Sequence, residues 1–118
     1  MIKIMENNNI LNPNFRKFDN SDFAAYSDAW HLPDGNGPFI EDSGAFVVVL
    51  SGDPYDDCAY CLEADYGDIC LGKTFKNAKD AYYFANKVSE ISKKYTNDDL
   101  SYDDAKDLLS KYLNPLNC

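Results

Sequence analysis

The chain has 118 residues and a net charge of −9, with 45% hydrophobic and 26% charged residues. This length suits one domain, and the ordinary composition excludes wholesale disorder and a fibrous repeat. No apolar run approaches the roughly 18 residues that a membrane-spanning helix needs, and the N-terminus lacks the apolar stretch of a secretory signal. We therefore expect a single domain over residues 1–118, no membrane association and a cytoplasmic location.

The first 19 residues are rich in asparagine, a composition that favours turns and coil over regular structure. We expect an irregular arm over residues 1–19 that Phe15 and Phe18 hold against the core. A short helix is predicted next, over residues 20–31. Its apolar side chains follow the three-then-four spacing of a helix face, at Phe23, Tyr26 and Trp30.

Three strands are predicted in the middle of the chain. Residues 44–51 contain consecutive β-branched residues and are apolar on both alternating faces, as in a central strand. Two further strands, over residues 58–64 and 69–75, follow the turn-forming segments 52–57 and 65–68. The expected result is a small three-stranded antiparallel sheet over about residues 44–75.

Two helices are predicted after the sheet, over about residues 77–95 and 101–113. Each begins with a capping residue, Asn77 or Ser101, three positions before an aspartate, and each carries an apolar stripe at helical spacing. The predicted fold class is therefore α+β, with a short helix before the three-stranded sheet and two C-terminal helices covering it.

The charges are unevenly distributed along the chain. Residues 18–72 hold ten Asp and two Glu but no Lys or Arg. This acidic balance opposes direct binding to DNA or RNA phosphates, but short carboxylates on turns can imitate a row of phosphates. We therefore expect a basic protein partner, namely a nuclease or another nucleic-acid-binding protein.

The candidate partner-binding residues lie on the two predicted turns of the sheet. Tyrosines there stand beside acids, and tyrosine is enriched at protein interfaces. The predicted site comprises Asp53, Tyr55, Asp56, Asp57, Asp65, Tyr66 and Asp68. The predicted function is that of an acidic, non-catalytic inhibitor that occludes the nucleic-acid site of a basic enzyme. It would act as a nucleic-acid mimic against a nuclease or CRISPR effector, or as an immunity protein against a nuclease toxin.

The cysteines raise an alternative function. Cys58 and Cys61 form a C-x-x-C pair and Cys70 follows, so a small metal-binding domain is conceivable. However, residues three apart on a strand point to opposite faces, and Asp56 and Asp57 would raise the pKa of nearby thiols. We therefore expect thiols rather than disulfides, and no metal. A generic accessory domain whose acidity only maintains solubility is a further alternative.

No catalytic constellation is evident in the sequence. The only histidine, His31, is expected at the end of the first helix, and no spacing ties it to a cysteine or serine nucleophile. The aspartate-rich segments lack the ligand spacing of an EF-hand, and phosphate-binding or dinucleotide-binding loops are missing. The sequence therefore predicts a protein that is not an enzyme and holds no cofactor.

Overall fold

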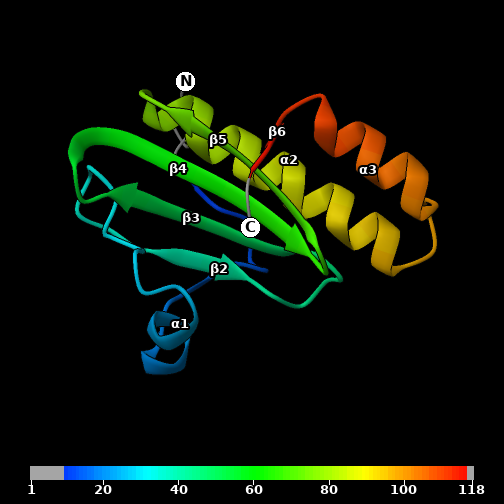
Figure 1. The fold of residues 1–118 in the computed structure, drawn as a ribbon, viewed down its shortest axis with the longest axis horizontal. Coiled ribbons are helices and arrows are strands. Elements are labelled where there is room, and N and C mark those ends of the chain that lie inside the picture. Colours follow the sequence, from blue (N-terminus) through cyan, green and yellow to red (C-terminus); the bar gives the residue numbers. More distant parts are fainter. Residues whose placement is uncertain (1–9, 117–118) are drawn as a thin grey trace, which may run out of the picture.

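In the computed structural model, which describes residues 10–116, six strands form one antiparallel sheet in chain order (Figure 1). The strands are β1 (Arg16–Lys17), β2 (Phe39–Glu41), β3 (Val47–Asp53), β4 (Asp56–Tyr66), β5 (Ile69–Phe75) and β6 (Asn114–Pro115). The helices are α1 (Asn20–Ala25), α2 (Ala78–Thr96) and α3 (Tyr102–Ser110). The α+β class is as expected, but the prediction of a three-stranded sheet was wrong.

The predicted hairpins form the centre of the sheet. β3 pairs with β4 through Leu50 and Leu62, and β4 pairs with β5 through Ala64 and Leu71. β4 is longer than predicted, because it begins at Asp56 and the turn before it shrinks to two residues, whereas β3 is displaced along the chain and runs to Asp53. Some residues that were predicted to form the turn therefore belong to the paired strands.

The missed strands have two or three residues each. β1 pairs with β2, β2 with β3, and β6 with β5. So short a strand has no readable alternation, and β6 meets a partner some forty positions away in the chain. The arm was therefore predicted wrongly at Arg16–Lys17, while residues 1–9, including the expected absence of a signal segment, lie outside the described residues.

The helix α1 is shorter than predicted and lies between β1 and β2 rather than before the sheet. Asp19 caps its N-terminus by accepting the backbone N–H groups of Ser21 and Asp22. The helix ends at Ala25, and Trp30 forms an isolated antiparallel bridge with Gly52 of β3. The placement of His31 at a helix end was therefore wrong, because pairing with the sheet overrides the helical spacing.

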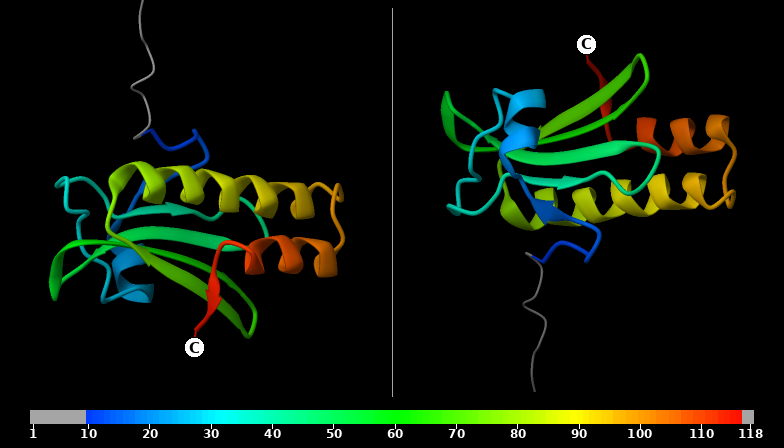
Figure 2. Two further views of the ribbon diagram at one scale, coloured as in Figure 1. Left: turned by 90° about the horizontal axis from the view of Figure 1, so that it is seen from above. Right: turned by 90° about the horizontal axis from the view of Figure 1, so that it is seen from below.

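The helices occupy both sides of the sheet. Both views of Figure 2 show α2 on one side and α1 on the other, while α3 runs beside α2. The predicted caps Asn77 and Ser101 accept the backbone N–H groups of Asp80 and Asp104. One cluster of buried side chains from β3, β4, β5, α2 and α3 forms the core. No helix within residues 10–116 has the length and apolarity to cross a membrane.

Candidate functional site

The seven predicted partner-binding residues lie in two groups at opposite ends of β4. This strand has eleven residues and so extends over about 30 Å. Asp53, Tyr55, Asp56 and Asp57 lie at or beside the β3–β4 turn, whereas Asp65, Tyr66 and Asp68 lie at or beside the β4–β5 turn. Consecutive turns of an antiparallel meander always alternate between ends, so one compact site cannot include all seven.

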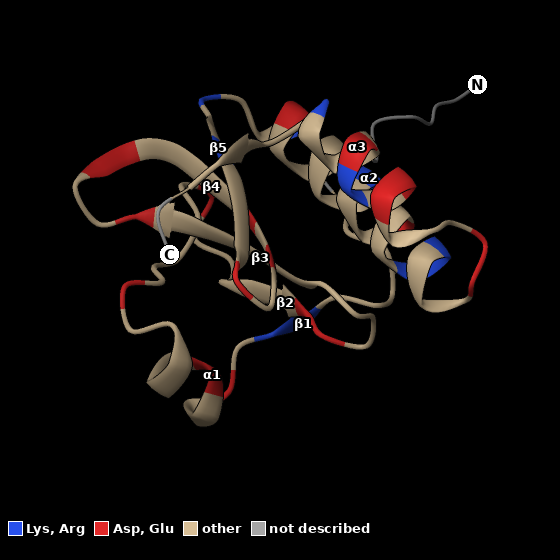
Figure 3. Ribbon diagram, turned by 45° about the vertical axis from the view of Figure 1, so that its right-hand side comes forward, with Lys and Arg blue, Asp and Glu red and all other residues tan. Residues whose placement is uncertain are grey.

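The β3–β4 turn presents its tyrosine almost completely to solvent. Tyr55 is 96% exposed, and the turn beneath it is stiffened because Asp53 Oδ1 accepts the Tyr55 N–H at 2.9 Å. Asp57 is exposed beside it. Figure 3 shows acidic segments at this turn and basic segments on β1 and α2. A projecting aromatic ring surrounded by carboxylates therefore occupies this end of the sheet.

Trp30 belongs to the same surface, although it lies more than twenty residues earlier in the chain. Its side chain is 49% exposed, and its carbonyl accepts the Gly52 N–H at 2.8 Å. A Cβ at Gly52 would lie 2.0 Å from the His31 carbonyl oxygen, so only glycine allows this segment to approach β3. We define the hairpin surface as Trp30, Asp53, Tyr55, Asp56 and Asp57.

Two hollows flank the hairpin surface. The first, of about 330 Å³, is lined by the aromatic residues Trp30 and His31 together with Asp53, Asp56 and Asp57. The second, of about 520 Å³, lies between residues 25–29 and the sheet, and Asp28, Asp53, Tyr55 and Glu63 are among its lining residues. Neither hollow is lined by a Lys or Arg among the described residues. Both hollows combine aromatic rings with negative charge, which suits cationic side chains.

Asp56 differs from its acidic neighbours because it has an internal partner. Its carboxylate forms an ion pair with Lys76 and accepts the Cys58 N–H at 3.0 Å. The Lys76 ammonium, followed by the Cys58 hydrogen bond, holds the pKa of Asp56 below its usual range. Part of its charge is therefore already balanced within the protein, which leaves Asp53 and Asp57 as the more available carboxylates.

The opposite turn offers a different surface. Tyr66 is 37% exposed, and its ring lies 5.1 Å from that of Phe46 and 5.9 Å from that of Tyr95, measured between centroids. Tyr102 closes the same cluster, with its ring 5.8 Å from that of Tyr66. Tyr66 thus packs within an aromatic cluster at the end of α2, unlike the projecting Tyr55.

Asp65 at this end faces a second carboxyl group. Burial, followed by the neighbouring Asp65, raises the pKa of Glu63 to about 7. The Tyr26 hydroxyl approaches Asp65 Oδ2 at 3.4 Å, and burial, together with this negative charge, raises the pKa of Tyr26 to about 12. Asp65 is therefore engaged with groups of its own chain.

The cysteines do not assemble the thiol site considered above. Cys58 and Cys61 are both free thiols, and the first is exposed while the second is half-buried. Burial, followed by the charge of Asp53, raises the pKa of the Cys61 thiol. Cys70 is disulfide-bonded, so the expectation of a thiol there was wrong; sequence spacing does not reveal which sulfurs are neighbours in space.

One group of potential metal-ligand atoms occurs among the described residues. It joins Glu63, Asp65 and Cys70, whose ligand atoms lie within 4.8 Å of one another. Because Cys70 is disulfide-bonded, this group supplies two carboxylates and no thiolate. Neither member of the C-x-x-C pair takes part, so the arrangement differs from a zinc site built on Cys58 and Cys61.

Sequence reasoning missed Trp30, Asp28 and Glu63 as neighbours of the hairpin. Trp30 was assigned to a helix face, where a tryptophan is ordinarily core. The available signal was the single tryptophan beside turn-forming residues, since tryptophan is among the residues enriched at energetically dominant interface positions. Its bridge to Gly52 depends on a backbone approach that no local pattern records.

Comparison with protein-family models, with curated proteins and with solved structures gives no significant match. The functional argument therefore depends on the surface itself.

Proposed function

We propose that this protein is an acidic, non-catalytic binding protein whose hairpin surface occupies the basic nucleic-acid-binding surface of a partner. The partner would be a nuclease or another nucleic-acid-binding protein, and the effect would be inhibition or neutralisation of that partner. The observation that carries the proposal is the nearly complete exposure of Tyr55, with half-exposed Trp30, among the carboxylates of Asp53, Asp56 and Asp57.

The mechanism is steric occlusion assisted by electrostatic steering. A negative end of the molecule accelerates encounter with a Lys- and Arg-rich groove, most strongly at low salt. After contact, Tyr55 and Trp30 supply aromatic area at a low entropy cost. Partner arginines would enter the hollow beside Trp30, where an aromatic face and three carboxylates meet.

The first test is capture of partners by tagged full-length protein at low and high salt, followed by mass spectrometry. A basic nucleic-acid-binding protein that is retained at low salt and released at high salt supports the proposal, and its nuclease or DNA-binding activity can then be assayed with and without this protein. Absence of any such protein at low salt contradicts the proposal.

The second test assigns the surface. The variant Tyr55→Ala/Asp57→Lys removes the projecting ring and reverses an exposed charge, and we expect at least a hundredfold loss of partner affinity. The matched control, Tyr83→Ala/Asp107→Lys, changes the same residue types on exposed positions of α2 and α3. Equal affinity of the two variants would exclude the hairpin surface as the binding site.

A further inference from the structure

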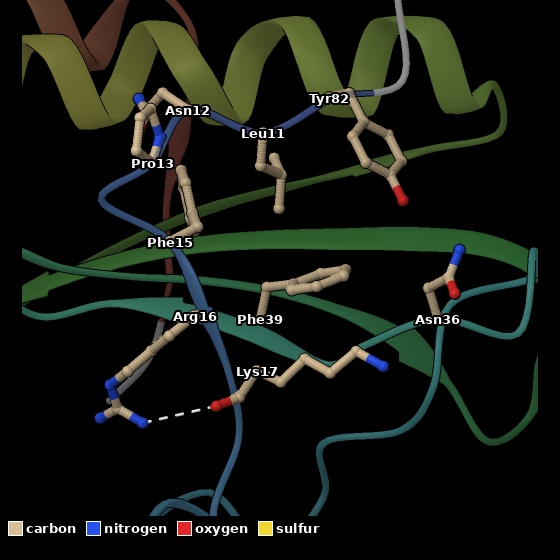
Figure 4. Close-up of a pocket in the computed structure, with 9 residues that line it drawn as sticks. All are labelled: Leu11, Asn12, Pro13, Phe15, Arg16, Lys17, Asn36, Phe39 and Tyr82. Atoms are coloured by element: carbon tan, nitrogen blue, oxygen red, sulfur yellow. Dashed lines mark hydrogen bonds between the residues drawn. The ribbon is translucent and has the colours of Figure 1, made fainter.

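A third hollow lies on the α2 side of the sheet edge, and its charge differs from that of the hairpin surface. It has a volume of about 410 Å³ and lies between residues 11–17, Asn36, the start of β2 and Tyr82 of α2 (Figure 4). We call it the arm pocket. Its apolar part consists of Leu11, Phe15 and Phe39, all of which also pack against the core.

Hydrogen bonds fix the arm that forms one wall of the pocket. Asn86 of α2 accepts the Asn12 N–H at 2.8 Å and donates to the Ile10 carbonyl at 2.9 Å. The Asn12 side chain donates to Ser89 Oγ at 3.1 Å, and the Phe15 N–H donates to the Asn12 carbonyl. Residues 10–15 are thus attached to α2, so the chain's own hydrogen bonds hold this wall of the pocket in place.

The charge of the arm pocket is opposite to that of the other two hollows. Of the described residues, its lining includes Arg16 and Lys17 but no Asp or Glu, in a protein with 20 acids and 11 bases. Arg16 is already bound by Asp22 and Asp42, at 2.6 Å and 2.8 Å. Lys17 forms no ion pair within residues 10–116. One uncompensated cation therefore belongs to the pocket.

The register of the edge strands directs Lys17 into the pocket. Lys17 pairs with Phe39 across β1 and β2, and directly paired residues project from the same face of a sheet. Figure 4 shows the Lys17 amino group, the Asn36 side chain and the Tyr82 hydroxyl at one end of the pocket, with Leu11 and Phe15 towards the other. We call the end with Lys17, Asn36 and Tyr82 the polar end; at the other end Asn12 and Arg16 lie with Leu11 and Phe15.

The polar end has donors for an anion. Asn36 makes its hydrogen bond to Asp34 through its backbone N–H, and its side-chain amide remains available to a ligand. Tyr82 donates its hydroxyl proton to Asp34 Oδ2 at 2.8 Å, so Tyr82 offers no donor to a ligand. Asp34 is the acidic residue that hydrogen-bonds to both of these residues. One of its carboxylate oxygens accepts the Asn36 backbone N–H, and the other accepts the Tyr82 hydroxyl. Lys17 and Asn36 are therefore the expected anion-binding pair.

We propose that the arm pocket binds a small monocarboxylate with an apolar body, such as a medium-chain aliphatic acid. The carboxylate would contact Lys17 Nζ and the Asn36 amide, and the apolar body would lie against Leu11, Phe15 and Phe39. The volume lies in the lower part of the range of small-molecule sites. This site is separate from the hairpin surface and does not depend on the function proposed above.

The probe is octanoate, measured by isothermal calorimetry and by displacement of the fluorescent sulfonate 1-anilinonaphthalene-8-sulfonate from the full chain. We expect saturable binding of one octanoate per chain. Octan-1-ol, which has the same chain length without the charge, should bind at least tenfold more weakly. Absence of saturable octanoate binding, or equal binding of the alcohol, would overturn the proposal.

Two variants locate the binding. Lys17→Ala and Asn36→Asp both alter exposed side chains at the polar end, and each should weaken octanoate about tenfold while leaving octan-1-ol unchanged. The control Lys106→Ala removes an exposed lysine from α3 with the same change in net charge. If Lys17→Ala binds octanoate as tightly as Lys106→Ala, the ligand lies elsewhere and the assignment is wrong.

Discussion

Glu41 and the hairpin surface use the same chemical group in opposite ways. The Glu41 carboxylate is fully buried beside α2 and accepts hydrogen bonds from two backbone N–H groups and two hydroxyls, those of Ser43, Gly44 and Ser89. Asp57 is exposed on the hairpin surface. A carboxylate thus contributes to folding through the donors that it satisfies, and a net charge of −9 does not distinguish the two uses.

The largest expected effect follows from removing the buried carboxylate. Glu41→Leu leaves the N–H groups of Ser43 and Gly44 without an acceptor, and we expect the free energy of unfolding to fall by about 3 kcal/mol in urea denaturation. Glu41→Gln retains one oxygen that accepts from these groups and should recover more than half of the loss. If the free energy of unfolding of Glu41→Leu equals that of the unchanged protein, the distinction between the two regions is wrong.

A smaller effect is expected at Ser89, which links Glu41 to the arm. Ser89 donates to Glu41 Oε1 at 3.2 Å and accepts from the Asn12 side chain at 3.1 Å. Ser89→Ala should therefore lower the free energy of unfolding by about 1.5 kcal/mol. Combined with Glu41→Leu in a double-mutant cycle, the two changes should be clearly non-additive. Strict additivity would mean that the hydroxyl does not act through Glu41.

Glu63 lies between the two extremes, since it is half-buried and its raised pKa lets it hold its proton at a higher pH than an exposed glutamate. The folded protein binds this proton up to about pH 7, while the unfolded chain releases it near its ordinary pKa of about 4.5. The native state therefore holds more protons in this window, and its stability should fall as the pH rises through it. The partial exposure limits the change to less than about 1 kcal/mol.

The measurement for Glu63 is urea denaturation at pH 5 and pH 8. Glu63→Gln cannot titrate, so this variant should lose most of the decrease in stability between the two pH values. Asp104→Asn, which changes an exposed carboxylate on α3, serves as the control and should retain that decrease. An unchanged pH dependence in Glu63→Gln would contradict the raised pKa of Glu63.

The smallest expected effect is at the hairpin surface itself. Asp57→Lys should change the free energy of unfolding by less than about 0.5 kcal/mol, because an exposed charge without a buried partner adds little to stability. Urea denaturation of this single variant measures that difference. A loss above 1 kcal/mol would show that the exposed acids also support the fold, and would remove the contrast with Glu41.

Local patterns predicted the elements that carry their own periodicity. The helices α2 and α3 form where their apolar stripes predict them, and they begin at the predicted caps Asn77 and Ser101. The predicted turns separate the three long strands β3, β4 and β5. The same reasoning failed where a residue's partner lies elsewhere in the chain. Trp30 follows helical spacing from Phe23 and Tyr26, yet it bridges to Gly52 because the sheet edge offers hydrogen-bond partners there.

The candidate site divides in the same way. The acidic turn and its tyrosine were read from residues 53–57, where sequence neighbours are also spatial neighbours. The addition of Trp30, the separation of Asp65 and Tyr66 from that turn, and the packing of Tyr66 with Tyr95 all depend on the sheet. Sequence alone lists charged and aromatic residues, and it does not say which of them share one surface.

For this protein, the sequence by itself determined the α+β class, the long helices and hairpins, and the concentration of acids in residues 18–72. Only the tertiary structure decided the six-stranded sheet, the burial of Glu41, the exposure of Trp30 and the position of Lys17 in the lining of the arm pocket. The reason is physical. Helical and strand periodicity is encoded by near neighbours, whereas the pairing of two-residue strands and the satisfaction of a buried carboxylate depend on donors and acceptors brought together from distant parts of the chain.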